Sequence, residues 1–171
     1  MLIRQKRERD LADCLHVLML VHSGDGYPLH LAPQEVPAFM SAEREVAAWV
    51  AESQGDVVGH VALHWAADDP TLTAARAATA VPMEDLYLVA RLFTAPHERR
   101  KGLGRLLLRH ALEHAWALGG RAVLDVGQPL LPAIALYESE GWTRIAALHP
   151  RIDDRRTLDL WVYLSPVDAT G

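Results

Sequence analysis

The sequence is poor in cysteine and in long apolar runs. Its single cysteine, Cys14, excludes an intrachain disulfide, and Leu11, Leu15 and Leu18 surround it at helical spacing, which predicts a buried packing thiol. No apolar run approaches the roughly 18 residues that span a bilayer, and no apolar core with a cleavage site follows the first ten residues. These absences predict a soluble, cytoplasmic protein that does not bind membranes.

Positive charge is scarce over most of the chain and concentrated in one segment. Seventeen basic residues stand against 22 acidic ones, a formal net charge of −5, which argues against nucleic-acid binding. The segment 96–109 holds five of the bases and one acid, which leaves 12 bases and 21 acids elsewhere, a net charge of −9. This asymmetry indicates a local site for an anion. The five bases are Arg99, Arg100, Lys101, Arg105 and Arg109.

The length predicts one domain over residues 1–171, since it leaves no room for two ordinary domains. Hydropathy patterning predicts that this domain mixes strands and helices. The prolines of segment 27–40 predict a loop with one irregular helical turn, and the alanine- and threonine-rich segment 66–82 predicts a long connection. The expected strands cover 2–5, 46–54, 57–65, 84–94, 122–126, 142–148 and 158–164, and the expected helices 9–22, 102–118 and 131–140. This order predicts an α/β fold, with 46–54 and 57–65 as a hairpin around Gly55-Asp56.

The segment between the strand 84–94 and the helix 102–118 has the composition of an anion cradle. The strand is apolar on both faces, which predicts a central position, and Gly102 and Gly104 open the helix behind a basic loop. Unpaired N–H groups and the positive end of the helix dipole favour a phosphate there. A Walker loop is absent, and Leu107 stands where a dinucleotide fingerprint needs its third glycine.

Two motifs in this half of the chain match one family. Residues 99–104 read R-x-x-G-x-G after a strand that ends in Leu92-Phe93-Thr94, and residues 136–142 read L-Y-x-x-x-G-W, with Ala133 before them. The chain resembles the GNAT superfamily of acyl-CoA-dependent N-acetyltransferases, best over residues 84–148. The resemblance implies a mixed, mostly antiparallel sheet of six to seven strands flanked by helices, with a V-shaped splay between the two central strands.

The resemblance also implies how acetyl-CoA, the acyl-donor substrate, is bound without a metal. Pantetheine would bond the backbone of the central strand, and the pyrophosphate would lie on the amides at the helix start. A primary amine of a small molecule or peptide would attack the thioester directly, helped by proximity and by a backbone N–H that polarises the carbonyl. The implied donor-binding residues are Leu92, Phe93, Thr94, Arg99, Arg100, Lys101, Gly102, Leu103, Gly104 and Arg105.

Tyr137 matches the family tyrosine that lies near the CoA sulfur and protonates the leaving thiolate, a role that suits a phenol. The general base is not readable from the sequence. Glu84, Asp85 and Asp125 are the nearest carboxylates in the matched region, and none occupies a position that transfers from the family.

Residues after the first helix are candidates for the acceptor site, because family members place acceptor-contacting loops there. They are His22, Asp25 and Tyr27, with loop capping and packing as the alternative. His60 and His64 share one face of a predicted strand, and packing is favoured over a role with the acceptor. His110 and His114 have a zinc-compatible spacing without a third ligand, so no metal is expected. The acidic remainder of the chain favours a cationic acceptor.

One departure from the family keeps a rival function open. The family often has an asparagine seven residues before the tyrosine, where it contacts pantetheine, and this chain has Leu130 there. A non-catalytic CoA- or acyl-CoA-binding module of the same fold is therefore the alternative to an enzyme, and a different nucleotide-binding interaction domain is a weaker one. Homodimers are common in the family, and a homodimer is among the expected states.

Overall fold

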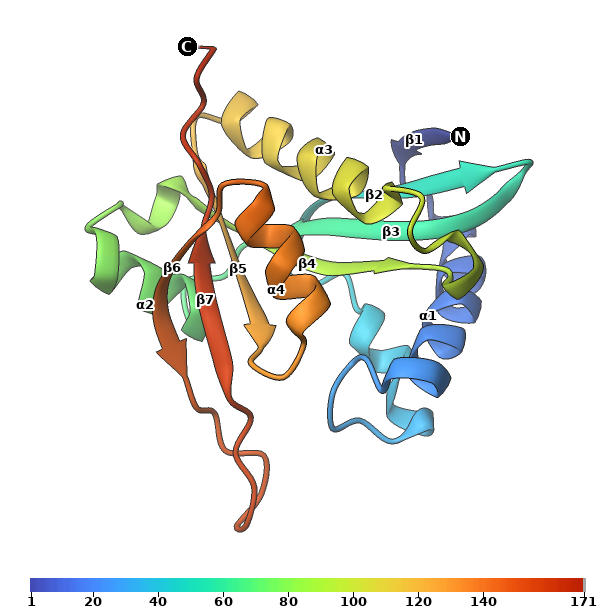
Figure 1. The fold of residues 1–171 in the computed structure, drawn as a ribbon, viewed down its shortest axis with the longest axis horizontal. Helices are drawn as coiled ribbons and strands as arrows, with labels where there is room; N and C mark the ends of the chain where they lie inside the picture. The colour runs from blue at the N-terminus through green and yellow to red at the C-terminus, as the bar shows by residue number, and fades with distance from the viewer. Residues whose placement is uncertain (171) are drawn as a thin grey trace. The chain divides into compact units, whose positions relative to one another are not determined.

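A computed structural model describes residues 1–170. The strands are β1 (Leu2–Gln5), β2 (Glu45–Ser53), β3 (Asp56–His64), β4 (Leu86–Thr94), β5 (Arg121–Gly127), β6 (Thr143–Leu148) and β7 (Leu160–Leu164). The helices are α1 (Leu11–Asp25), α2 (Pro70–Thr79), α3 (Leu103–Ala117) and α4 (Leu131–Ser139). Hydrogen bonding in the described residues orders the strands β1-β2-β3-β4-β5-β7-β6 (Figure 1). The mixed, mostly antiparallel sheet with flanking helices is confirmed.

The chain forms two compact units whose boundaries fall inside β4 and α3. The first unit contains Met1–His64 and Ala90–Ala111, and the second contains Trp65–Val89 and residues 112–170. The single domain expected over 1–171 stays a prediction. No helix within residues 1–170 is both long enough and apolar enough to cross a membrane.

The first unit is built on the hairpin of β2 and β3, with β1 antiparallel on the outer side of β2. Ser53 pairs with Asp56, so the turn residues are Gln54 and Gly55, one residue earlier than expected. Both have a positive φ, 54° and 89°, which is the backbone of a type I′ turn. Such a turn matches the twist of the paired strands and explains the shift of the turn onto Gly55.

Both faces of β3 are covered within the first unit. α1 packs on one face through the buried side chains of Cys14, Val17 and Leu18. Burial raises the pKa of the Cys14 thiol to about 12, so its role is packing, as expected. A Cβ on Gly59 would lie 2.9 Å from the Leu107 side chain, so glycine permits the close approach of β3 and α3.

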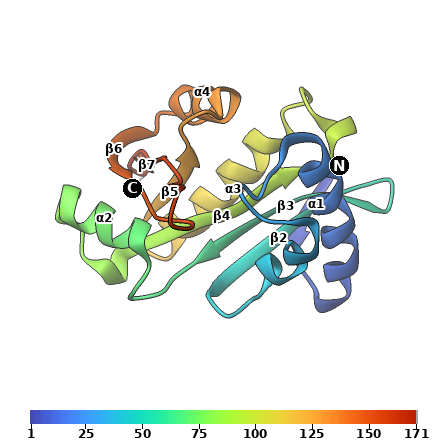
Figure 2. The same cartoon turned by 90° about the horizontal axis from the view of Figure 1, so that it is seen from below.

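The second unit carries the parallel pair of the sheet. Leu86–Leu88 of β4 pair with Arg121–Val123 of β5, which confirms the expected β-α-β unit, and β5 continues antiparallel through β7 to β6. Figure 2 shows α2 and α4 on opposite faces of the strands β5, β7 and β6.

The helix α2 corrects the expectation that segment 66–82 is a connection without regular structure. Asp69 caps the helix, because its side chain accepts hydrogen bonds from the N–H groups of Thr71 and Leu72, and Pro70 occupies the first helical position. Leu72 and Ala75 are fully buried. The Asp-Pro start and the run of alanines carried the signal for this helix.

Candidate functional site

The loop between β4 and α3 is fixed to the hairpin of the first unit. The N–H of Ala95 donates to the Val58 carbonyl over 2.8 Å, and a single 3₁₀ turn, Pro96–Glu98, follows. The Glu98 side chain is largely buried, and its carboxylate lies 3.3 Å from the Lys101 ammonium. Lys101 therefore holds the loop as well as adding charge to it.

The backbone before α3 is in the left-handed region at two positions, Arg100 (φ 63°) and Gly102 (φ 79°). The first helical hydrogen bond runs from the Leu106 N–H to the Gly102 carbonyl over 3.1 Å. The N–H groups of Leu103 and Gly104 precede this bond and belong to the helix start, where the dipole favours an anion. Arg100, Lys101 and Gly102 are exposed. This part of the expected donor site forms a helix start with exposed cations beside it.

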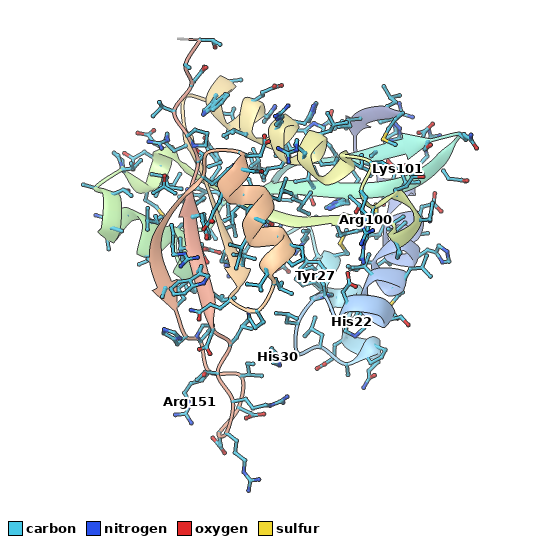
Figure 3. All side chains as sticks on the ribbon, in the orientation of Figure 1. His22, Tyr27, His30, Arg100, Lys101 and Arg151 are labelled. Carbon is cyan, nitrogen blue, oxygen red and sulfur yellow. The ribbon has the colours of Figure 1, made fainter. Side chains whose placement is uncertain are left out.

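Arg99 is exposed and pairs with a carboxylate. Its guanidinium donates two hydrogen bonds to Asp25, one of them 3.0 Å long from Nη1 to Oδ1. Asp25 ends α1, so the ion pair joins the loop to the first helix of the chain. Arg100 has no carboxylate within ion-pair distance among residues 1–170, and Figure 3 shows Arg100 and Lys101 on the loop before α3.

The end of β4 contributes one buried ring and two partly exposed residues. The Phe93 ring is buried and stacks on the His60 ring, with centroids 5.2 Å apart and an interplanar angle of 16°. Leu92 and Thr94 are partly exposed. The Phe93 side chain is therefore a packing group, and any contribution from this residue to a ligand comes from its backbone.

The three acceptor candidates lie at the end of α1 and just beyond it. The Gly26 N–H donates to the His22 carbonyl over 2.9 Å and closes the helix, and the Tyr27 ring contacts the Phe39 ring edge-on, with centroids 5.8 Å apart. The buried Nδ1 of His22 has no hydrogen-bond partner among the described residues. Asp25 is held by Arg99, and Figure 3 shows His22 on α1 and Tyr27 in the segment that follows it.

Arg91 of β4 is a residue that sequence reasoning missed. Its φ is 56°, and its side chain lies over the Phe39 ring, 5.2 Å from the centroid, while Nη1 donates to the Ser41 carbonyl over 2.5 Å. Burial lowers the pKa of the guanidinium from its ordinary value. An arginine inside a strand that is otherwise apolar on both faces was the available signal.

Two histidines of β3 accompany Arg91. The Nδ1–H of His60 donates to the Arg91 carbonyl over 2.8 Å, which leaves Nε2 with its lone pair, and this nitrogen has no partner among residues 1–170. Nε2 of His64 is also buried and unpartnered. Burial lowers the pKa of His60 to about 3 and that of His64 to about 4, so both rings are neutral at physiological pH.

Tyr137 of α4 lies in the second unit, between the rings of Trp142 and Tyr163, with centroids 6.4 and 6.2 Å away. Burial, and then the negative charge of Asp125, raise the pKa of the phenol above its ordinary value. Tyr137 is therefore fully protonated at neutral pH, as a proton donor must be. Asp125 accepts a 2.7 Å hydrogen bond from the Thr71 hydroxyl, and burial raises its pKa.

Leu130 occupies the N-cap position of α4 and makes no side-chain capping bond. Its backbone N–H donates to the Gly127 carbonyl over 2.9 Å, and the next turn begins with Leu131 and Pro132. The helix start is thus closed by backbone bonds, and an apolar side chain stands where the family often has an amide.

Comparison with known proteins decides the family. The model of the acetyltransferase (GNAT) family matches residues 17–142. The chain belongs to this family. Two relatives carry N-acetyltransferase names: human N-acetyltransferase 8, 35% identical over 120 residues, and Bacillus subtilis YhfO, an uncharacterized N-acetyltransferase, 30% identical over 113 residues. These matches cover 63% and 64% of this chain. The chain spans about half the length of the human relative (48%) and 68% of the bacterial one.

Solved structures of GNAT proteins share the fold at low identity. The Escherichia coli ribosomal-protein-S18-alanine N-acetyltransferase has a TM-score of 0.70 and 19% identity, with 99% of this chain and 96% of that chain covered. Salmonella typhimurium YncA, solved with its cofactor acetyl-CoA, has a TM-score of 0.70 and 20% identity, with 98% and 94% covered. The GNAT fold inferred from the two motifs is confirmed.

Proposed function

We propose that this GNAT protein transfers the acetyl group of acetyl-CoA to a primary amine of a small molecule or peptide. The observation that carries the proposal is the helix start of α3. Arg100 and Gly102 turn the backbone through the left-handed region, exposed cations flank it, and the first helical amides follow. Such a helix start suits a pyrophosphate, and family membership supports CoA as its carrier.

Each part of the donor has a proposed binding segment. The pyrophosphate lies on the amides of residues 100–105, with Arg100 and Lys101 at its rim, and pantetheine bonds the backbone of Leu92 and Thr94, as the family resemblance implies. Arg99 is a weaker contributor of charge than expected, because Asp25 already neutralises it. Leu130 offers no amide, so a pantetheine contact from this position would need its backbone.

In the proposed reaction the amine nitrogen bonds to the acetyl carbon while the carbon–sulfur bond breaks. The departing thiolate takes a proton from the Tyr137 hydroxyl, and the acceptor nitrogen loses a proton to solvent or to a base that stays unassigned. The raised pKa of Tyr137 keeps its proton in place until the thiolate forms, although it reduces the driving force for the transfer. A cationic acceptor, a homodimer and a cytoplasmic location remain predictions from the sequence.

Acetyl-CoA binding and thiol release test the proposal together. Acetyl-CoA should raise the melting temperature, by an amount that corresponds to about 2.7 kcal/mol at 100 times its Kd. Thiol release with a panel of primary amines should then identify turnover. Stabilisation without thiol release from any amine would favour the non-catalytic binding module, and the absence of both would overturn the proposal.

Charge reversal tests whether acetyl-CoA binding depends on the cations at the start of α3 or only on the net charge of the protein. Arg100→Glu with Lys101→Glu should weaken acetyl-CoA binding by about 10-fold or more, since it removes two cations beside a phosphate. The matched control reverses Arg151 and Arg155, two exposed bases of the connection between β6 and β7. The control changes the net charge equally and should leave acetyl-CoA binding within about twofold.

A further inference from the structure

The guanidinium of Arg91 is a cation that the first unit does not neutralise. Among residues 1–170 no carboxylate oxygen lies within ion-pair distance of it, and its one side-chain hydrogen bond goes to the Ser41 carbonyl. An arginine carries five N–H donors, and burying them without acceptors is costly. Arg91 is only partly exposed, yet none of its guanidinium nitrogens is among the buried side-chain atoms that lack a partner, so its remaining donors reach solvent.

The carboxylate that attracts Arg91 is already paired with another cation. Glu45 acts on Arg91 electrostatically, but its Oε2 accepts a 2.7 Å hydrogen bond from the Lys6 ammonium, and both side chains of this pair are largely buried. Glu45 also stands opposite His64 in the pairing of β2 with β3. Because Glu45 is paired with Lys6, Arg91 has no carboxylate of its own within ion-pair distance among residues 1–170.

The groups around Arg91 make this cation a receiving site more than a clamp. Arg91 fastens the segment with Phe39 and Ser41 to β4 through one ring contact and one hydrogen bond. These two contacts are all that a structural clamp would need. The guanidinium donors that neither contact uses are not among the buried atoms without a partner, so they are open to a ligand. The positive charge of Arg91 helps to lower the pKa of both histidines, so all three groups share one electrostatic environment.

We infer that Arg91 binds a carboxylate of the acceptor, so that the acceptor class is amino acids and other amines that carry a carboxylate near the amine. The guanidinium fork matches a carboxylate with two parallel hydrogen bonds, and the Phe39 ring fixes its plane. The inference rests on the proposed function and names the substrate class of that same activity. It differs from the expectation of a cationic acceptor, because the local charge at Arg91 is positive while the acidity is spread over the chain.

Matched acceptor sets test this class. L-phenylalanine, L-phenylalaninamide and phenethylamine share one side chain and differ in the carboxylate, and L-methionine, L-methioninamide and 3-(methylthio)propylamine form a second set. Thiol release from acetyl-CoA should give a kcat/KM about 10- to 100-fold higher for at least one amino acid than for its two matched amines, the range expected for one charged hydrogen-bonded contact.

Variants at position 91 separate recognition from folding. Arg91→Gln should lower kcat/KM for the amino acid about 10- to 100-fold and leave the KM for acetyl-CoA and the rate with the matched amine within about twofold. Arg91→Lys should recover part of the loss, since it keeps the charge and loses the fork. Arg144→Gln is the control, because Arg144 also lies over a ring, 4.1 Å from the Trp161 centroid, in the second unit.

A binding measurement independent of turnover completes the test. N-acetyl-L-phenylalanine and N-acetylphenethylamine, the two products, are titrated by NMR into the CoA-loaded protein, with the histidine ring signals as the readout. The inference is supported if the first binds at least about tenfold more tightly and Arg91→Gln removes the difference. Equal binding, or binding of neither, overturns it.

The two proposals fail in different ways. Thiol release with phenethylamine or with a diamine, but not with any amino acid, overturns the acceptor class and leaves the acetyltransferase proposal intact. If Arg91→Gln lowers kcat/KM equally for all three members of a matched set and also lowers the melting temperature, Arg91 is a clamp. No thiol release with any amine overturns the proposed function, while the product titration still decides whether Arg91 binds a carboxylate.

Discussion

Arg99 and Asp25 lie 74 residues apart in the sequence and form an ion pair with two hydrogen bonds. The pair links the loop before α3 to the last residue of α1. It places a negative charge beside the proposed phosphate site, while the assignment of Asp25 to the acceptor site stays a prediction. Both side chains are substantially exposed, 40% and 44%, which limits what the pair adds to stability.

Removing the Asp25 charge should therefore strengthen donor binding. Asp25→Asn keeps the side-chain shape and leaves Arg99 with its full charge, so we expect the Kd for acetyl-CoA to fall about two- to fivefold, while the free energy of unfolding falls by less than about 1 kcal/mol. Calorimetric titration at two salt concentrations measures both the affinity and its screening. A weaker affinity would contradict this, and would mean that the ion pair positions the loop.

Gly102 should be required for its backbone conformation rather than for space. A Cβ would meet nothing within 4 Å, but φ is 79°, so Gly102→Ala should cost about 1 kcal/mol of stability and reduce acetyl-CoA affinity as the helix start relaxes. Gly24→Ala is the control, because Gly24 also has open space and lies inside α1 without a positive φ. That control should stabilise the protein by up to about 1 kcal/mol. Equal effects of the two substitutions in urea unfolding would refute the conformational argument.

Tyr137→Phe should lower kcat about 100-fold and leave the KM for acetyl-CoA nearly unchanged, since it removes a proton donor and keeps the ring. The pKa of Tyr137 is raised, so the wild-type kcat should show no falling limb from phenol ionisation up to about pH 10. A stopped-flow pH profile of thiol release checks both statements. A proportional loss of donor binding would instead indicate a structural tyrosine.

Asp125→Asn should stabilise the protein at neutral pH. Burial raises the Asp125 pKa above its ordinary value of 3.8, so the folded state loses stability as the pH rises from that value through the raised pKa. Asparagine carries no charge and still accepts the hydrogen bond from Thr71. The melting temperature of the variant should exceed that of the wild type at pH 7, and the difference should vanish below about pH 4. A variant that is less stable at every pH would contradict this expectation. It would show that an interaction of the Asp125 carboxylate stabilises the fold by more than burial of its charge costs.

Periodicity and composition located most of the elements. The two motifs identified the GNAT fold, because each lies in a short contiguous segment: the glycines stand before one helix and the tyrosine lies within another. The helix α2 was missed although its signal was local. Alanine and threonine in segment 66–82 suggested a connection, while Asp69 and Pro70 supplied a cap and a first turn, and burial of Leu72 gave the helix a face to pack.

The sequence by itself determined the composition of the helix start before α3, since Gly102, its neighbouring cations and the amides that follow are contiguous. The tertiary structure alone decided that Asp25 neutralises Arg99 and that Phe39, Ser41 and His60 meet Arg91. Each of these contacts joins residues at least 31 positions apart in the sequence, and only the pairing of strands and the packing of α1 bring them together. Whether a guanidinium is neutralised depends on which carboxylates lie within ion-pair distance of it. The order of residues does not specify that distance, because the fold sets it.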